Sequence, residues 1–174
     1  MYTGVYMKKK LIPIIATIVL FIDQIIKLII RKNMNLYNSI KIIKNFFNIT
    51  YVKNIGAAWS IFSGFQIPLI IFTIIVLIIL YYYFVKDKCL KNCEIIIYGI
   101  LLGGILGNLF DRIFLNGVID YLDFNILGYD FPIFNFADIA IVISMFSLVF
   151  LELRGEKNDS KWWKCKYKIR PLFS

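Results

Sequence analysis

The sequence predicts an α-helical membrane protein with four transmembrane helices and a small extracytoplasmic β platform between the first two helices. Hydrophobic residues make up 60% of the 174-residue chain and its mean hydropathy is +0.74, whereas about half of an ordinary soluble domain is apolar. Four apolar stretches are long enough to cross about 30 Å of hydrocarbon. They lie at about 11–30, 67–85, 95–115 and 134–153. We therefore expect one membrane-embedded domain over residues 1–174.

The first apolar stretch begins after Lys8–Lys10, as a secretory signal peptide would, but it is too long for the apolar region of such a peptide. It also contains Asp23, Gln24 and Lys27, and no small-residue cleavage site follows it. We therefore expect a first helix that is retained in the membrane.

The distribution of Lys and Arg residues predicts which side of the membrane each segment occupies. Thirteen of them fall in the N-terminal segment, in the loop between the second and third helices and in the segment 154–170, whereas six fall on the other side. We expect both termini to be cytoplasmic, with a basic tail at about 154–174 that lies on the anionic leaflet. Membrane contact then accounts for the formal charge of +9, and we expect no nucleic-acid partner.

About 35 residues separate the first two helices, which is too long for a structureless connection in a compact domain. The segment IKIIKNFFNITYV is rich in β-branched and aromatic residues, which predicts short strands in an outer region at about 36–64. At its end, the segment KNIGAAWSIFSG (residues 53–64) is either a re-entrant turn or a backbone-rich wall beside a substrate, with Asn54 as a hydrogen-bonding anchor.

The third helix carries a stripe of glycines. Gly99, Gly103 and Gly107 recur at four-residue spacing, and Gly104 lies beside them. Small residues on one face of a membrane helix let a neighbouring helix approach closely. The stripe therefore predicts helix packing and requires no chemistry.

The segment GNLFDR at the end of the third helix places Asn108, Asp111 and Arg112 on one helical face. They form either an Asp111–Arg112 ion pair at a water-facing helix end or a buried polar network that shapes a site. Asp23 and Lys27 are four residues apart in the first helix, where a charge usually has a partner that faces the bundle. We therefore expect a structural Asp23–Lys27 ion pair.

Asp120, Asp123 and Asp130 lie in an expected outer loop, where exposure to water would explain each acid alone. The segment FNFAD then opens the fourth helix, and Asn135 at the N-cap with Asp138 three residues later matches a capping pair. Convergence favours a functional interpretation, because the predicted topology brings the polar residues of all these segments to one depth. The set is Asp23, Asn54, Asn108, Asp111, Arg112, Asp120, Asn135 and Asp138.

Histidine is absent from the sequence, which excludes Ser-His and Cys-His catalytic pairs and leaves acid–base chemistry to carboxylates. Cys89, Cys93 and Cys165 are expected to meet a reducing compartment and remain thiols, and we expect no metal site. Two other classes of protein stay open. One is a small ion-coupled carrier that uses Asp23 and Lys27 as a relay, and the other is a lipid-headgroup transferase that holds Mg²⁺ on clustered carboxylates.

Five blocks of sequence, in order, resemble the lipoprotein signal peptidases (signal peptidase II), a family of intramembrane aspartyl proteases of bacterial cytoplasmic membranes. The blocks are FIDQIIK, NIGAAWSIFSG, GGILGNLFDR, GVIDY and FNFADIAI, and together they extend over nearly the whole chain. One block alone would be weak evidence, but five in the right order are specific. The tail beyond Leu153 lies outside the resemblance, and Met7 is an alternative start.

The resemblance implies roles for residues of this chain. Asp120 in the V-x-D block and Asp138 at the end of F-N-x-A-D match the catalytic aspartates, whereas Asp111 matches an aspartate that shapes the site. The remaining matched positions are expected to bind substrate or shape the site. They are Asp23, Lys27, Asn54, Gly56, Asn108, Arg112, Asn135 and Ala137.

The resemblance also implies a substrate, a prolipoprotein that carries a diacylglyceryl group on the cysteine that becomes the first residue of the mature protein. Cleavage is expected on the N-terminal side of that cysteine. Two carboxylates at a low-dielectric boundary tend to hold one proton between them, so that one can activate water while the other donates a proton. We expect no cofactor, membrane lipid as the surroundings, a monomer, and an active site near the extracytoplasmic face of the bacterial cytoplasmic membrane.

Overall fold

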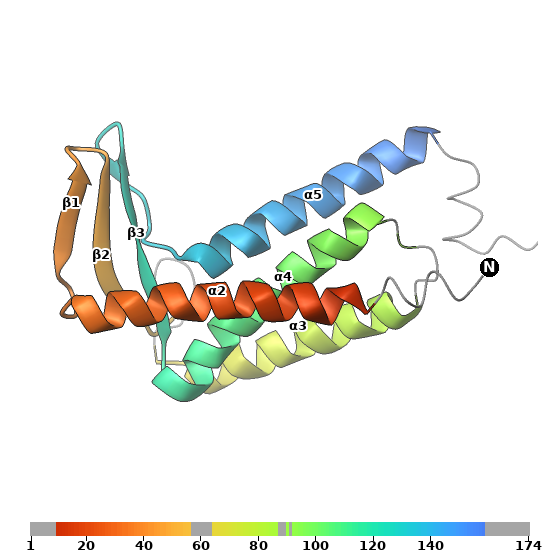
Figure 1. The fold of residues 1–174 in the computed structure, drawn as a ribbon, viewed down its shortest axis with the longest axis horizontal. Helices are drawn as coiled ribbons and strands as arrows, with labels where there is room; N and C mark the ends of the chain where they lie inside the picture. The colour runs from red at the N-terminus through yellow and green to blue at the C-terminus, as the bar shows by residue number, and fades with distance from the viewer. Residues whose placement is uncertain (1–9, 57–63, 87–89, 91, 159–174) are drawn as a thin grey trace, which may run out of the picture.

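The computed structural model of the protein describes residues 10–56, 64–86, 90 and 92–158. Most of the predicted wall segment, the basic tail from residue 159 onward, Cys89 and Cys165 lie outside these ranges. Four helices run roughly along the long axis of the molecule, and a small sheet stands across one end of them (Figure 1). We call this end of the bundle the sheet end.

The helices follow the four apolar stretches of the sequence. They are α2 (Leu11–Asn33), α3 (Gln66–Lys86), α4 (Asn92–Leu115) and α5 (Phe136–Asn158). Among the described residues, the three helical segments Leu11–Asn33, Asn92–Leu115 and Phe136–Arg154 are long and apolar enough to cross a membrane, whereas Gln66–Tyr82 is apolar but shorter.

The sheet has four antiparallel strands in the order β1-β2-β3-β4. They are β1 (Ser39–Ile43), β2 (Phe47–Asn54), β3 (Val118–Ile126) and β4 (Tyr129–Asp130). The first two lie in the segment where strands were predicted, but β3 and β4 lie in a segment that we expected to be an outer loop. That expectation was wrong, because the aspartates of VIDYLDFNI suggested exposure although its β-branched and aromatic residues favour a strand.

The connection between α4 and β3 is very short, and this fixes where β3 begins. Gly117 has φ +150°, and a Cβ atom at this position would lie 3.1 Å from the carbonyl oxygen of Asn54 on β2. A residue without a side chain is therefore needed where the chain turns from the helix into the sheet. Directly after this turn β3 pairs with β2, with Val118 opposite Asn54 and Asp120 opposite Val52.

Helix α4 occupies the centre of the bundle and packs against α2, α3 and α5. The predicted glycine stripe of α4 packs against two neighbouring helices, α2 and α5. Gly103 faces Val19 of α2, whereas a Cβ atom at Gly104 would lie 2.7 Å from the carbonyl oxygen of Ala137 in the first turn of α5. Close packing at Gly104 therefore positions the beginning of α5.

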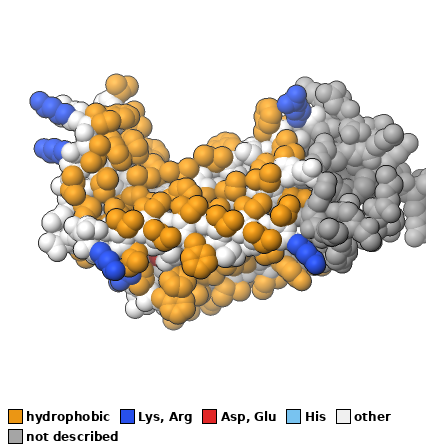
Figure 2. All heavy atoms as spheres, in the orientation of Figure 1, with side chains coloured by type: hydrophobic (Ala, Val, Ile, Leu, Met, Phe, Trp, Pro, Cys, Tyr) orange, Lys and Arg blue, Asp and Glu red, His pale blue; other side chains and the backbone are white. Residues whose placement is uncertain are grey.

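The surface of the bundle is apolar. Large hydrophobic side chains such as Phe21, Phe72 and Phe146 are more than 60% exposed, and Figure 2 shows apolar side chains along much of the visible helical face. Such a surface would be costly in water but suits contact with lipid chains. A smaller buried cluster of Ile30, Ile119 and Tyr121 joins the sheet to the end of α2.

Candidate active site

A cluster of polar side chains is buried at the sheet end of the bundle, where α2, α4, β3 and the start of α5 meet. Six of its members are no more than 6% exposed: Asp23, Lys27, Asn108, Asp111, Asp120 and Asn135. Buried polar groups are costly unless they are hydrogen-bonded, so the contacts within the cluster decide its role.

Asp120 projects from β3 and is held by two side-chain amides. Asn135 Nδ2 donates to its Oδ1 at 2.7 Å, and Asn54 Nδ2 donates to its Oδ2 at 3.0 Å. The amide oxygen of Asn54 in turn accepts a hydrogen bond from the backbone nitrogen of Gly56 at 2.9 Å. Asn54, which we predicted to be a hydrogen-bonding anchor, thus binds the carboxylate of Asp120.

Asp138 lies in the first turn of α5 and is held by the capping pair that the sequence predicted. Asn135 N donates to Asp138 Oδ2 at 3.1 Å, and Asp138 N donates to Asn135 Oδ1 at 3.0 Å. Asn108 on α4 adds a third contact, because its Nδ2 donates to Asp138 Oδ1 at 2.8 Å. The carboxylate of Asp138 therefore faces α4.

Asn108 and Asn135 join the two aspartates through one continuous set of hydrogen bonds. Asn135 Nδ2 contacts Asn108 Oδ1 at 3.2 Å as well as Asp120, and Asn108 Nδ2 contacts Asp138. Each amide NH₂ points at a carboxylate, and the two amides contact each other. Asp120 and Asp138 are consequently held as a pair although 18 positions separate them in the sequence.

Behind this pair, Lys27 lies between two further aspartates. Its Nζ is 2.8 Å from Asp23 Oδ2, 2.9 Å from Asp111 Oδ2 and 3.0 Å from Asn108 Oδ1. The predicted Asp23–Lys27 ion pair is confirmed. The predicted alternative of a surface Asp111–Arg112 ion pair is wrong, because Asp111 is fully buried and pairs with Lys27 on the neighbouring helix.

The two aspartates of this trio also hold the backbone of the site. Asp111 Oδ2 accepts a hydrogen bond from the backbone nitrogen of Ile119 at 3.1 Å, next to Asp120. Asp23 Oδ1 accepts one from the backbone nitrogen of Ala137 at 3.2 Å, next to Asp138. Each buried carboxylate therefore fixes the backbone beside one member of the aspartate pair.

Arg112 lies near three aspartates. Its guanidinium interacts electrostatically with Asp138, Asp120 and Asp111, in decreasing order. Its Nε is buried and has no hydrogen-bond partner among the described residues. This arrangement places a positive group beside the aspartate pair, with one donor that no described residue uses.

Burial raises the pKa of Asp120 from 3.8 to about 7, and the nearby charge of Asp138 acts in the same direction. The hydrogen bonds from Asn54 and Asn135 favour the ionised form and lower the pKa, but they do not outweigh burial. Asp120 can therefore gain and lose a proton near neutral pH. A general acid or base requires this property.

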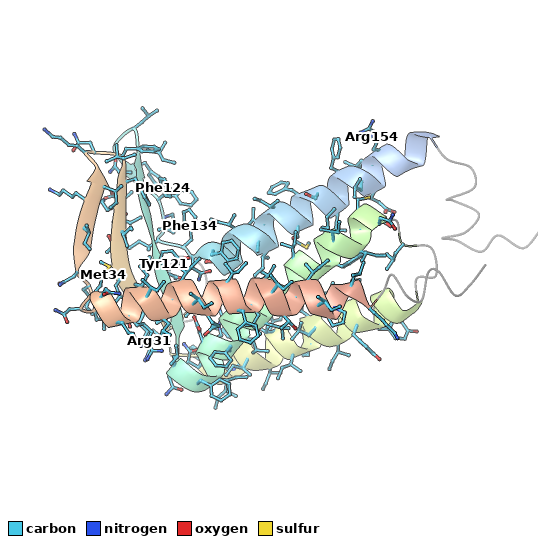
Figure 3. The ribbon with its side chains drawn as sticks, viewed as in Figure 1. Arg31, Met34, Tyr121, Phe124, Phe134 and Arg154 are labelled. Atoms are coloured by element: carbon cyan, nitrogen blue, oxygen red, sulfur yellow. The ribbon has the colours of Figure 1, made fainter. Side chains whose placement is uncertain are left out.

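Two residues of the site were missing from the sequence-based prediction. Gln24 donates to Asp111 Oδ1 at 2.9 Å, and its place next to Asp23 in FIDQIIK was the available signal. Tyr121 is buried, and its hydroxyl accepts a hydrogen bond from the backbone nitrogen of Phe136 at 3.2 Å. Figure 3 shows Tyr121 and Phe134 between the sheet and the start of α5. Tyr121 lay in a segment that we expected to be an outer loop, and its place next to Asp120 in GVIDY was the available signal.

The predicted site residues thus come together, including Gly56 and Ala137 through their backbone nitrogens. Among the described residues, no three His, Cys, Asp or Glu side chains are arranged to hold a metal ion. A pair of aspartates in an apolar helical bundle, Asp120 buried and Asp138 partly buried, defines the class, a membrane-embedded aspartic peptidase.

Comparisons with known proteins identify the family. Residues 15–154 match the family model described as Signal peptidase (SPase) II. The chain is 41% identical over 148 residues to lipoprotein signal peptidases of Staphylococcus aureus strains JH9 and Newman, covering 85% of this chain and 91% of each relative. The chain belongs to the signal peptidase II family of aspartic peptidases.

Solved structures agree with this assignment. The fold matches a structure described as a bacterial membrane enzyme at 2.3 Å resolution, with a TM-score of 0.76, 40% identity, and coverage of 85% of this chain and 90% of that chain. A second structure, described in the same words at 1.9 Å resolution, matches with a TM-score of 0.73 and 41% identity over 81% of this chain and 91% of that chain.

Proposed function

We propose that this protein removes the signal peptide from diacylglyceryl-modified prolipoproteins by cutting on the N-terminal side of the lipidated cysteine. The observation that carries the proposal is the pairing of Asp120 and Asp138 through Asn135 and Asn108. Signal-peptide removal from lipoproteins agrees with the names of the relatives. The aspartate mechanism and the position of the cut rest on the site geometry and on the motif resemblance.

Two aspartates and one water molecule suffice for this hydrolysis. We place the resting proton on Asp120, whose pKa is raised to about 7, and the negative charge on Asp138, which is held by a backbone N–H at the start of α5. Asp138 then takes a proton from water as the water oxygen attacks the scissile carbonyl carbon. The carbonyl oxygen becomes negatively charged and is stabilised by the Asp120 proton and by Arg112.

Collapse of the tetrahedral intermediate breaks the C–N bond. The proton that Asp138 took from water passes to the leaving amine, which becomes the amino terminus of the lipidated cysteine. Asp120 keeps its proton, so the pair returns to its resting state without a covalent intermediate. The buried amides of Asn108 and Asn135 keep both carboxylates aligned throughout these steps.

The membrane arrangement that we propose has four spanning helices, with α3 included. Helix α3 has 21 residues, and at a rise of about 1.5 Å per residue it is long enough for the hydrocarbon core. The distribution of Lys and Arg favours cytoplasmic termini, which would place the sheet end on the extracytoplasmic face of a bacterial cytoplasmic membrane. The enzyme would act as a monomer.

The test is to incubate the purified protein with a diacylglyceryl-modified prolipoprotein and, separately, with the same precursor without the lipid. The mass of the mature product identifies its first residue. We expect a product that begins at the lipidated cysteine, and only from the modified precursor. Equal cleavage of both precursors, or a cut at another bond, would contradict the proposed specificity.

A further inference from the structure

A pocket opens at the sheet end, between α2 and α4. Its volume is about 200 Å³, and its lining residues are Gln24, Lys27, Leu28, Arg31, Phe110 and Leu115. The four residues from α2 are spaced i, i+3, i+4 and i+7, so they form one stripe along that helix. The pocket therefore follows the seam between the two helices.

The two positive side chains of the pocket wall, Lys27 and Arg31, differ in whether they can contact a ligand. Lys27 has its three donors directed at Asp23, Asp111 and Asn108, so it offers the pocket only its aliphatic stem. Arg31 is exposed and has neither an ion pair nor a hydrogen bond from its side chain among the described residues. Arg31 is thus the positive group of this pocket that can bind a ligand.

In the proposed membrane arrangement, Arg31 lies at the depth where lipid acyl chains meet the headgroups. It lies in the last turn of α2, and Figure 3 shows it at the sheet end of that helix. On the opposite side from the sheet, the exposed apolar side chains of Leu28 and Phe110 continue the wall. A cation above an apolar groove suits a molecule with a negative head and a hydrocarbon chain.

We propose that this pocket binds the headgroup of an anionic phospholipid, with the Arg31 guanidinium on the phosphate and an acyl chain along Leu28 and Phe110. Arginine is suited to this role because its planar group can donate two parallel hydrogen bonds to a phosphate. None of the described lining residues is acidic, so they offer no carboxylate for the ammonium of a zwitterionic headgroup. This binding is independent of the proposed peptidase reaction.

The test uses the full chain purified in detergent micelles. Phosphatidylglycerol or phosphatidylcholine is added in increasing amounts, and native mass spectrometry counts the lipids that stay bound. Arg31→Gln is compared with Lys32→Gln, because Lys32 is the next residue in the same last turn, is exposed and does not line the pocket. We expect Arg31→Gln to weaken binding of one phosphatidylglycerol about tenfold, as for loss of a bidentate charged contact.

We expect Lys32→Gln to weaken the same binding by less than about twofold, as for an exposed charge. Leu28→Trp keeps the charge and fills the groove, so it should also weaken phosphatidylglycerol binding. Equal losses in Arg31→Gln and Lys32→Gln would overturn the proposal, because they would indicate general surface attraction. Equal binding of phosphatidylcholine, or equal competition by soluble glycerol phosphate, would overturn it too, since the site would then not select an anionic lipid.

Discussion

Asn135 holds Asp120 through its side chain, with Nδ2 2.7 Å from Oδ1, while its backbone nitrogen donates to Asp138 Oδ2 at 3.1 Å. One residue therefore contacts both aspartates, one from a strand and the other from a helix. The capping of α5 and the alignment of the aspartate pair are consequently the same structural feature. Helix caps usually contribute stability alone, whereas this one also holds the carboxylate of Asp120 on a neighbouring strand.

The Asn135→Ser variant separates these two functions of Asn135. Serine can still cap α5, but its shorter side chain cannot reach Asp120. We expect Asn135→Ser to lower kcat by about 100-fold or more, in keeping with the loss of alignment of an acid–base pair. Asn135→Ala, which also loses the cap, should unfold at a lower temperature than Asn135→Ser by an amount equivalent to about 1 kcal/mol. Near-normal kcat in Asn135→Ser would show that Asp120 does not need this contact.

Among the described residues, Lys27 is the one cation that forms an ion pair with both Asp23 and Asp111, and this predicts an order of stabilities. Lys27→Met leaves two buried carboxylates together without a positive partner, which should cost about 3–5 kcal/mol. Asp111→Asn leaves Lys27 paired with Asp23, so it should cost less, about 1–3 kcal/mol. Thermal unfolding in detergent should therefore rank wild type above Asp111→Asn, and Asp111→Asn above Lys27→Met. The reverse order would mean that Asp111, rather than Lys27, holds the trio together.

The raised pKa of Asp120 predicts a pH dependence of the reaction. In the proposed mechanism Asp120 needs its proton to stabilise the carbonyl oxygen, and the protonated fraction of Asp120 falls as the pH rises through about 7. We expect kcat/KM to follow a bell-shaped curve with its basic limb near this value and an acid limb where both aspartates are protonated. A flat profile through the acid and neutral range would contradict a shared proton.

The same shift predicts a pH dependence of stability. The folded pKa of Asp120 lies above the ordinary value of 3.8, so the folded state binds this proton more tightly than the unfolded state. The resulting stabilisation is fully present below about pH 4 and is lost as the pH rises through about 7. Asp120→Asn cannot ionise at this position, so its unfolding temperature should fall less than that of the wild type between these pH values.

The helices could be predicted from the sequence because each coincides with a long apolar stretch, and three of the described helical segments are long enough to cross a membrane. The Asp23–Lys27 pair and the Asn135–Asp138 cap were also predictable, since both depend on local helical spacing. Such contacts follow from the sequence because they connect residues only three or four positions apart.

Contacts between distant segments could not be predicted in the same way. Asp111 pairs with Lys27 across two helices, and no local pattern distinguishes this partner from the adjacent Arg112. Strand β3 was missed because Asp120 and Asp123 suggested a solvated loop, whereas the fold places Asp120 in the interior at 3% exposure. Acidic residues usually indicate an exposed segment, but Asp120 is buried because it belongs to the polar cluster of the site.

The most direct test of the aspartate pair compares three variants of one protein. Asp120→Asn and Asp138→Asn each remove one titratable group but keep the shape of the side chain. Asp123→Asn is the matched control, since Asp123 lies on the same strand and is held by Thr50 rather than by the amides of the site.

The measurement is the rate of cleavage of a diacylglyceryl-modified prolipoprotein by each purified variant, after thermal unfolding has shown that it is folded. We predict a loss of at least about 1,000-fold for Asp120→Asn and for Asp138→Asn, and a rate close to that of the wild type for Asp123→Asn. Substantial cleavage by a folded Asp120→Asn or Asp138→Asn variant would contradict catalysis by this pair.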